Sequence, residues 1–466
     1  MEHAQVIQGD ETLYHRAALN IASGHGYSYS RSAPYLATNH RMPGFPFFLS
    51  VLYSITGPRP WTAIVVHVLV SLVTIALLHR LCLYAFDASV AGVCAWLMAL
   101  YPLDVVSTMT LLREPLFLVF LTASWFAWVA YALRGRLSHL AASAAFLSLS
   151  AYLRDNAVYQ VFALAPLLLM PDARGTAARR RFLAIALFVG VFAACLAPWA
   201  WRNHRRIGTW QLTSAGGSTM LTGNGAYLLA KKHGCDFEQM IHVLHHVLLK
   251  RYAMPSQLPP EIQAALRGTY VTNDGLVNSV SPSWFHSTNE PVIQLHSVQD
   301  ISDAQAKLFS MIVRDNMHSY LGYMCIGVVK IIFTPLWQET MRIMLPALDS
   351  GRFATAVVHA DIEWLRGVGL GALVCALTAA MAMTLFDLAV GIAGIAGLIL
   401  FLRTGRNAML KATWCSSIAY TLLVSTGPCA VSRFRYGLLP FMLPLAAFAL
   451  VTLADWYSTR HSSRSS

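Results

Sequence analysis

The sequence predicts an all-helical protein that crosses a membrane about eleven times, and three observations support this prediction. Of its 466 residues, 56% are hydrophobic and only 12% are charged, whereas a soluble domain has about 25% charged residues. Apolar runs of roughly 20 residues recur along the chain, and a helix of that length crosses a hydrocarbon core of roughly 30 Å. Lysines and arginines stand between these runs, mostly in alternate loops. Because a backbone in lipid must satisfy its own hydrogen bonds, the runs are expected to be helices.

Five of the apolar runs contain no charged residue. They are Pro115–Leu133, Phe182–Trp201, Gly367–Phe386, Ala412–Ser432 and Tyr436–Ala454. Six shorter runs complete the count, at Trp61–Leu78, Ala88–Leu103, Leu137–Leu153, Asn156–Pro171, Tyr320–Trp337 and Leu388–Leu402. One buried helix of a soluble protein would explain a single run, but not this series. The formal charge of +12 is spread between the runs and forms no single stripe, which argues against a nucleic-acid partner.

The short loops fall on two sides that differ in their content of Lys and Arg. One side holds fifteen: Arg80, Arg134, Arg136, Arg174, Arg179, Arg180, Arg181, Arg342, Arg352, Arg366, Arg403, Arg406, Lys411, Arg460 and Arg464. The other side holds four, which are Arg113, Arg154, Arg433 and Arg435. The positive-inside rule places the first side in the cytoplasm, with the C-terminus inside and the N-terminus outside. Residues 1–42 hold neither a spanning run nor a signal peptide, so either a further helix precedes them or the first hairpin translocates them; of the two, we expect the further helix.

Four regions follow from this pattern. We expect an external head at residues 1–60, an N-terminal transmembrane module at 61–201, an external segment at 202–321 and a C-terminal transmembrane module at 322–466. The head is expected to start with an amphipathic helix from about Asp10 to Ser23, with Leu13, Ala17 and Ile21 on one face. A short apolar run then ends at Gly57 and is predicted to be interfacial or re-entrant. The external segment has a further helical stretch near Phe237–Tyr252.

Carboxylates stand at the outer ends of the predicted spans. Asp10 and Glu11 open the head helix, where an N-cap and a first-turn acid would also be favourable. Glu114 precedes an uncharged span, a costly place for a carboxylate unless it is paired or functional. Asp104 and Arg113 lie in the same loop as Glu114, so an ion pair within the loop is the alternative interpretation.

Arginines on the external side need a reason, because topology favours basic residues inside. They are Arg154, Arg202, Arg433 and Arg435. The sequence Arg433-Phe434-Arg435 starts the last span, at the level where a lipid phosphate lies. Guanidinium groups bind phosphate bidentately, whereas anchoring at the membrane interface would not require two of them so close together.

Other conspicuous residues have plainer interpretations. Trp199 and Trp201 stand at a span end, as membrane-interface anchors do. His242, His245 and His246 lack an acidic or cysteine partner at a fixed spacing, which favours a solvated helix over a zinc site. The eight cysteines show no CxxC spacing and mostly lie inside apolar runs.

Taken together, these segments resemble the GT-C glycosyltransferases of the protein O-mannosyltransferase and aminoarabinose-transferase type. The matching motifs begin with Asp10-Glu11-x-x-Tyr14 and Arg41-Met42-Pro43-Gly44-Phe45-Pro46, followed by Leu112-Arg113-Glu114-Pro115-Leu116-Phe117, Leu153-Arg154, Ala197-Pro198-Trp199-Ala200-Trp201-Arg202-Asn203 and Arg433-Phe434-Arg435-Tyr436-x-x-Leu439-Pro440. The resemblance covers most of residues 9–225 and 300–455. The region from about Lys231 to Asp300 matches no motif.

The resemblance implies an inverting transfer of a sugar from a polyprenyl-phosphate donor to a lipid, glycan or protein acceptor. It implies an integral protein of a bacterial inner membrane with its active site facing the periplasm. Asp10 would be the base, supported by Glu11 and Glu114, and a divalent metal cation held by Asp10 and Glu114 is expected. Arg433 and Arg435 would take the leaving phosphate, together with Arg202 and Arg154.

A transporter or flippase for a lipid-linked or anionic substrate is the alternative function, because it would use the same arginines without chemistry. Transporters tend to place ionisable residues near the middle of the membrane. Here these residues gather at the outer interface, apart from Lys330 and Asp387. This distribution favours interfacial chemistry. A structural subunit of an envelope complex would instead leave Asp10, Glu114 and Arg435 freely replaceable.

Overall fold

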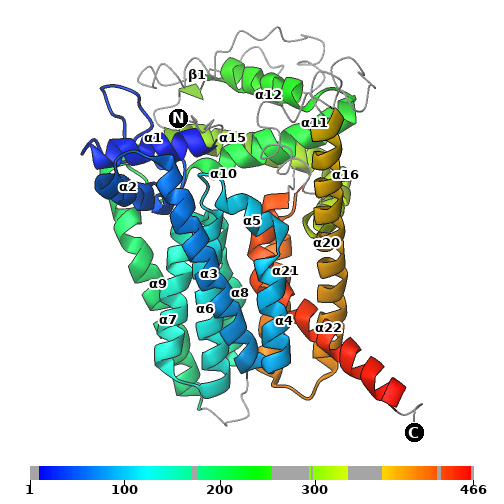
Figure 1. Cartoon of the computed structure of the whole chain (residues 1–466). Coiled ribbons are helices and arrows are strands. Elements are labelled where there is room, and N and C mark those ends of the chain that lie inside the picture. The colour runs from blue at the N-terminus through cyan, green and yellow to red at the C-terminus, as the bar shows by residue number, and fades with distance from the viewer. Residues whose placement is uncertain are drawn as a thin grey trace.

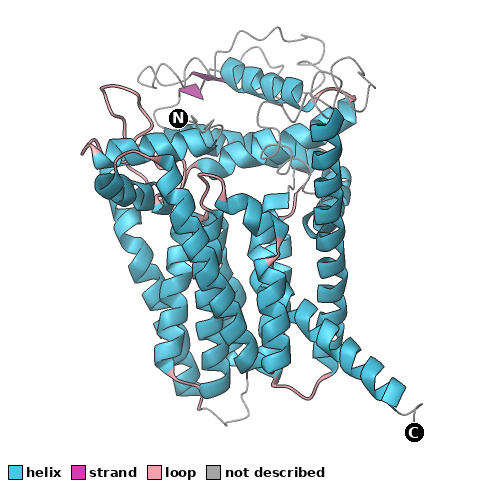
Figure 2. Cartoon of the chain, in the orientation of Figure 1, coloured by secondary structure: helices cyan, strands magenta, loops and turns pink. Residues whose placement is uncertain are grey.

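The computed structural model describes residues 10–170, 177–253, 293–294, 298–333, 370–427 and 432–462. Long helices run side by side, and a layer of helices lies across one end of them (Figure 1). Apart from one pair of two-residue strands, the regular elements among the described residues are helices, and loops connect them (Figure 2). The N-terminal head lies at the covered end, and the C-terminus lies at the opposite end.

The head contains two short helices, α1 (Asp10–Ala22) and α2 (Gly44–Thr56). The predicted amphipathic helix is therefore confirmed, with one adjustment to its buried face. Tyr14, Ala17 and Ala18 are buried, whereas Leu13 and Ile21 are only partly so. The face turns in this way because the Tyr14 ring packs edge-on against Phe45 of α2, with ring centroids 5.2 Å apart. The short apolar run is a helix of 13 residues, too short to cross a membrane alone.

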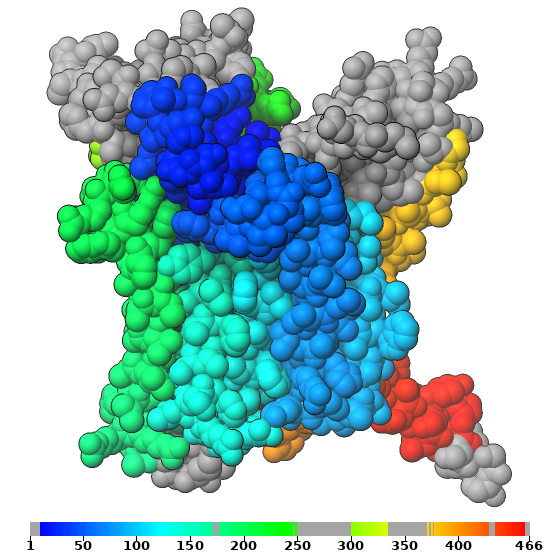
Figure 3. All heavy atoms as spheres, turned by 60° about the vertical axis from the view of Figure 1, so that its left-hand side comes forward, coloured from blue at the N-terminus to red at the C-terminus, as the bar shows by residue number. Residues whose placement is uncertain are grey.

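The N-terminal module forms the packed centre of the bundle. Its elements are α3 (Pro60–Ala85), α4 (Ala88–Ala99), α5 (Pro102–Thr108), α6 (Glu114–Arg134), α7 (Leu137–Leu153), η1 (Asp155–Tyr159), α8 (Gln160–Leu164), η2 (Ala165–Leu169) and α9 (Ala178–Ile207). Helix α6 is central: 78% of its apolar span is buried, against 28% for α3 and for α9. Figure 3 shows α9, α7 and α3 along one outer face, beneath the head.

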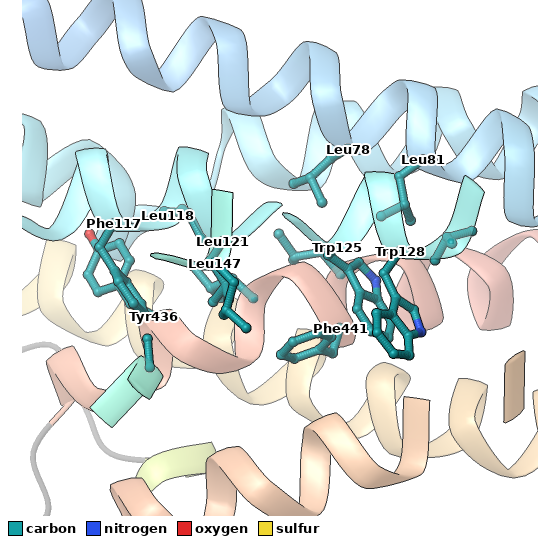
Figure 4. Packing of buried hydrophobic residues seen from close by; sticks show 14 of the residues in the cluster. Leu78, Leu81, Phe117, Leu118, Leu121, Trp125, Trp128, Leu147, Tyr436 and Phe441 are labelled. Carbon is teal, nitrogen blue, oxygen red and sulfur yellow. The ribbon is translucent and has the colours of Figure 1, made fainter. Parts of the chain in front are cut away.

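Aromatic side chains join the central helix to the last helix of the chain. Figure 4 shows Trp125 and Trp128 of α6 beside Phe441, and the ring centroids of Trp125 and Phe441 lie 4.7 Å apart. Buried indoles need partners for their N–H groups. Trp128 donates to the Thr413 hydroxyl at 3.3 Å. These contacts tie the two transmembrane modules into one core.

The segment 202–321, which the sequence predicts to be external, supplies most of the covering layer in the described part of the chain. It consists of α10 (Ala215–Ser218), the π-helix η3 (Thr219–Gly225), α11 (Ala226–His233), α12 (Phe237–Arg251), β1 (Tyr252–Ala253), β2 (Ile293–Gln294) and α15 (Val298–Asp315), with β1 and β2 parallel. The predicted helical stretch is thus confirmed as α12. Helix α15 approaches α10 so closely that a Cβ on Gly217 would lie 1.9 Å from the Ser302 carbonyl oxygen.

The C-terminal module corrects the predicted span count. It contains α16 (Met317–Phe333), α20 (Leu370–Arg403), α21 (Ala408–Ser425), η5 (Ser432–Leu438) and α22 (Leu439–Ser462). The separate runs at 367–386 and 388–402 were a wrong prediction, because α20 continues through Asp387. In the described part of the chain, five helices are long and apolar enough to cross a membrane. The pair α4–α5, bent by 49°, would be a sixth, so the count of about eleven is not confirmed.

The end of the bundle away from the head is rich in basic residues that bind helix ends. Arg180 donates to the Gly135 carbonyl at 3.1 Å, and Lys411 donates to the Leu402 carbonyl at 2.8 Å. The last carbonyls of a helix lack partners within the helix and carry partial negative charge, so cations stabilise them.

Candidate functional site

The acid pair of the head lies beside an arginine from the following loop. The Asp10 Oδ1 and Arg41 Nη2 atoms are 3.0 Å apart, and their side chains are 17% and 24% exposed. Glu11, the next residue, is buried. Acids in a first turn offset the helix dipole, which explains why α1 begins here. Of the two acids, Asp10 is the one that a molecule at the head could reach.

Tyr14 stands one turn after Asp10, and therefore on the same side of α1. It is buried, with the Arg113 guanidinium carbon 5.8 Å from the centre of its ring. Burial raises the pKa of Tyr14, and four charged groups act on its hydroxyl. They are Arg113, Asp10, Arg41 and Glu114. The structure thus brings Asp10 and Glu114, far apart in sequence, to one tyrosine.

Glu114 is the first residue of α6 and its side chain faces inward. The residue is 3% exposed, and the Oε2 atom has no hydrogen-bond partner among the described residues. Its neighbour Arg113 donates to the Leu153 carbonyl at 2.8 Å instead of pairing with Asp104. Burial alone would lower the pKa of Arg113, but four neighbours raise it above its usual range. They are Tyr14, Glu114, Asp155 and Asp10.

Three buried polar atoms around this point have no hydrogen-bond partner within the described chain. They are the Tyr14 hydroxyl, Glu114 Oε2 and Arg41 Nε. Burying such a group without a partner costs about 1–3 kcal/mol, and native proteins rarely leave them unsatisfied. The Tyr14 hydroxyl and Arg41 Nε can donate hydrogen bonds, and Glu114 Oε2 can accept one. These three atoms therefore fit a polar molecule that carries hydroxyl or phosphate oxygens.

The four predicted phosphate-binding arginines do not form one cluster. Arg202 donates to the Thr38 carbonyl at 2.7 Å and to the Tyr27 carbonyl at 3.1 Å. Its guanidinium also lies 4.8 Å from the Trp199 ring centre. Arg202 therefore holds the segment that leads to Arg41. Trp199 is buried in the head, whereas Trp201 is exposed, as an interface anchor would be.

The other three arginines lie around η5. Arg154 is buried between the rings of Phe117 and Phe434, at 5.2 and 5.6 Å from their centres. Arg435 is buried and paired with Asp387, with Nη1 and Oδ2 2.5 Å apart. Arg433 belongs to η5, but its side chain lies outside the described residues. Their binding of a lipid phosphate stays a prediction.

Two further residues of the site were missed from the sequence. Asp155 follows Arg154 at the start of η1, and its charge acts on Arg113. His40 precedes Arg41: burial and then Arg41 lower its pKa to about 4, against the opposing effects of Asp10 and Asp155. Arg41 and Arg113 need negatively charged neighbours if they are buried, and this need was the one signal that pointed to nearby acids. Nothing local distinguishes these residues from ordinary loop residues.

The expected metal site was tested against the residues present. No group of three or more His, Cys, Asp or Glu side chains that could hold a metal ion occurs in the described ranges. Asp10 already pairs with Arg41. The donor set is therefore limited to two carboxylates, which does not fit a site built by the protein alone.

Comparison with known families supports the resemblance. Residues 40–201 match the model of a family described as dolichyl-phosphate-mannose-protein mannosyltransferase. The matched range contains Arg41, Arg113, Glu114 and Arg154, and Asp10 lies before it. Among curated proteins, none matches the sequence significantly.

Matches among solved structures include two kinds of protein. Archaeal oligosaccharyltransferase AglB from Archaeoglobus fulgidus, in complex with an inhibitory peptide and a dolichol-phosphate, is 10% identical over 100% of this chain and 49% of its own, with a TM-score of 0.51. ArnT from Cupriavidus metallidurans, bound to undecaprenyl phosphate, is 12% identical over 95% of this chain and 74% of its own, with a TM-score of 0.40.

The chain spans about half the length of the AglB protein that it matches. At this identity, the likeness to AglB shows a shared fold. Together with the family match, it confirms the resemblance to GT-C glycosyltransferases that the sequence motifs indicated.

Proposed function

We propose that this GT-C-like chain moves a sugar from a polyprenyl-phosphate donor to an acceptor on the outer side of the membrane, with inversion at the sugar. One observation supports this most directly: Asp10, Arg41, Arg113 and Glu114 all act on Tyr14 at the covered end of the bundle. Carboxylates to accept a proton and cations to balance a departing phosphate are the two groups that such a transfer needs.

Asp10 is the proposed base because its carboxylate is partly exposed and its contact with Arg41 holds it in place. It takes the proton of the acceptor hydroxyl or amine while the acceptor atom forms a bond to the anomeric carbon. The bond from that carbon to the phosphate oxygen breaks, and its electron pair leaves with the polyprenyl phosphate. Attack from the opposite face inverts the anomeric centre. Glu114 supports Asp10 through its charge, which acts on Tyr14 and Arg113, and Glu11 is proposed as a second supporting acid beside Asp10.

Arg154, Arg433 and Arg435 are proposed for the donor phosphate, because η5 brings them toward the outer part of the bundle. Arg202 is better explained as a positioning residue. Its guanidinium donates to oxygens of Thr38, Tyr27 and Asn203, and the contacts with Thr38 and Tyr27 hold the loop that carries Arg41.

A divalent cation would have to share Asp10 and Glu114 with oxygens of the donor phosphate, since Mg²⁺ is often held by one or two carboxylates and substrate phosphates. Such an ion would supply positive charge to the leaving group. The protein's own arginines supply charge of the same sign, so no step proposed here requires the ion.

The covered end is proposed to face outward, in the periplasm of a bacterial inner membrane. This assignment rests on the basic residues at the other end, including Arg180 and Lys411 at helix ends. Lys and Arg are enriched on the cytoplasmic side of membrane proteins. The periplasmic side therefore carries Asp10 and Glu114.

The substitution Asp10→Asn tests the proposal. Asn caps a helix about as well as Asp, so a capping role predicts little change in stability. A base predicts a loss of roughly 100-fold or more in turnover. Release of undecaprenyl phosphate from undecaprenyl-phosphate sugars would be followed in the parent, in Asp10→Asn and in the matched control Asp455→Asn, whose residue is exposed in α22.

Normal turnover by Asp10→Asn would remove Asp10 as base and leave Glu11 and Glu114. A parent protein that moves the lipid-linked sugar between leaflets without cleaving it would instead favour the transporter or flippase. Purified protein in vesicles, with the donor sugar labelled, separates these two results.

A further inference from the structure

A buried ion pair joins two elements of the C-terminal module within the bundle. Arg435 of η5 and Asp387 of α20 contact each other at 2.5 Å, with their side chains 3% and 2% exposed. The Arg435 Nε atom also donates to the Ile331 carbonyl of α16 at 2.7 Å. Tyr101, at the start of α5, is buried and feels the charges of both partners. One guanidinium thus links three separate helical segments.

The pair lies near the outer boundary of the hydrocarbon layer. Asp387 is 16 residues before Arg403, the last residue of α20, or about 24 Å at 1.5 Å per residue. Glu114 is 20 residues before Arg134, the last residue of α6, or about 30 Å. Both helices end at the same end of the bundle (Figure 1). With a hydrocarbon core of roughly 30 Å, the pair lies a few ångströms inside the outer surface, close to the depth of lipid phosphates.

Charge balance limits what can bind at Arg435. The pair is neutral as it stands, and a phosphate added to it would leave one or two uncompensated negative charges in a buried place. That arrangement would cost several kcal/mol. A phosphate monoanion that replaced Asp387 at the guanidinium would keep the balance when the displaced carboxylate takes up one proton from solvent, so that the neutral acid stays buried and the phosphate pairs with Arg435. The guanidinium favours this exchange, because its planar fork can hold two phosphate oxygens at once.

We infer that Asp387 is a resident counter-ion that occupies the phosphate-binding edge of Arg435 and is displaced by the donor's phosphate. This inference rests on the proposed function, since it deepens the role of Arg435 in that function. Asp387 keeps the arginine neutralised and oriented while no donor is bound. It also makes donor binding weaker than it would be with an uncharged residue, because the phosphate must first break the pair. Binding then frees α20 from η5.

The test uses undecaprenyl phosphate and undecaprenol, which differ only in the phosphate. Asp387→Asn should bind undecaprenyl phosphate about 10-fold more tightly than the parent does, because a competing state has been removed. Undecaprenol should bind both proteins equally, and Asp455→Asn should behave like the parent. Arg435→Gln should lose the preference for the phosphate. Unchanged or weaker phosphate affinity in a folded Asp387→Asn protein would overturn the inference.

A second measurement uses the parent protein alone, so it tests the displacement of Asp387 even if the Asp387→Asn protein does not fold. A hydrophobic carbodiimide labels protonated carboxyl groups in apolar surroundings, which is the state of Asp387 after it has been displaced from Arg435. Undecaprenyl phosphate should increase labelling of Asp387 in the parent protein severalfold, and undecaprenol should not. Equal labelling would contradict displacement. A parent protein that binds neither lipid would contradict the proposed function itself, whereas an active parent with unchanged labelling contradicts only the role of Asp387.

Discussion

Two groups of charged residues in this protein differ in how completely their buried polar atoms are paired. At the head, Asp10, Arg41 and Glu114 lie close to Tyr14, and several of their polar atoms have no partner within the described chain. In the bundle, Arg435 and Asp387 contact each other directly and are almost fully buried. The first group is incompletely satisfied and partly open to solvent. The second group is closed.

This difference separates residues that are open to a ligand from a pair that holds the fold until a ligand displaces one of its members. A buried polar atom without a partner costs free energy, so its persistence indicates a ligand or a catalytic task. A buried ion pair with good geometry gives little net stability, but breaking it is expensive. Substitutions at the head should therefore affect turnover, and substitutions in the pair should affect stability first.

The largest effect is expected from breaking the buried pair. Arg435→Ala leaves the Asp387 carboxylate buried without its cation, and removing one partner of such a pair costs about 3–5 kcal/mol. Chemical denaturation of the purified protein should show this loss of unfolding free energy. The exposed Arg206 provides the control, because Arg206→Ala removes the same group from the surface and should change stability by less than about 0.5 kcal/mol.

A double variant sharpens the result. In Arg435→Ala/Asp387→Ala, no charge is left without its partner, so most of the lost stability should return. If the double variant is as unstable as the sum of the two single variants, the pair is not the cause of the loss.

A smaller effect, on turnover, is expected from Glu114→Gln at the head. Glutamine keeps the shape of the side chain and removes its charge, so one charge-assisted contact worth about 1.5–3 kcal/mol is lost, or roughly 10- to 100-fold in turnover. Stability should change little, because Glu114 Oε2 has no partner to lose among the described residues. Glu238→Gln, on the exposed side of α12, is the matched control. A large drop in stability with normal turnover would show that Glu114, like Arg435, mainly stabilises the fold.

The sequence was a reliable guide where local periodicity decides the structure. The helix from Asp10, the short apolar helix before Gly57 and the helix near Phe237 all appear with bounds close to those expected. Hydropathy also located the long spans, because a lipid-crossing helix needs an apolar run of a fixed length. The motif around Glu114, which is short and contiguous, lies within residues 40–201, where the family model matches and supports the resemblance.

The sequence was a poor guide where a distant partner decides. Asp387 looked like the break between two spans, but Arg435, 48 positions later, neutralises it and lets α20 continue. Arg113 looked like a partner for Asp104, yet it donates to the Leu153 carbonyl. His40 and Asp155 carried no local signal. Each of these cases depends on a tertiary contact that no spacing in the sequence reveals.

The smallest effect is expected from His40, which borders the open group at the head. Its pKa is lowered to about 4, chiefly by burial and then by Arg41, from the usual 6.5. As pH falls below about 6.5, the unfolded chain takes up a proton at this residue before the folded chain does. The folded state should therefore lose stability between about pH 6.5 and pH 4, with no further loss from this residue below that range. We expect less than about 2 kcal/mol in total, because the ring is only partly buried.

The variant His40→Gln isolates this contribution, because glutamine does not titrate. Its unfolding free energy, measured by chemical denaturation at a series of pH values, should fall less steeply than that of the parent between pH 6.5 and 4. Above pH 7 the two curves should run parallel, since His40 is neutral in both states there. His15 and His245, whose pKa values are also lowered by burial, are present in both proteins and cancel in the difference. Parallel curves over the whole range would mean that His40 is solvated like an ordinary loop histidine, and that the open group at the head reaches no further than Arg41.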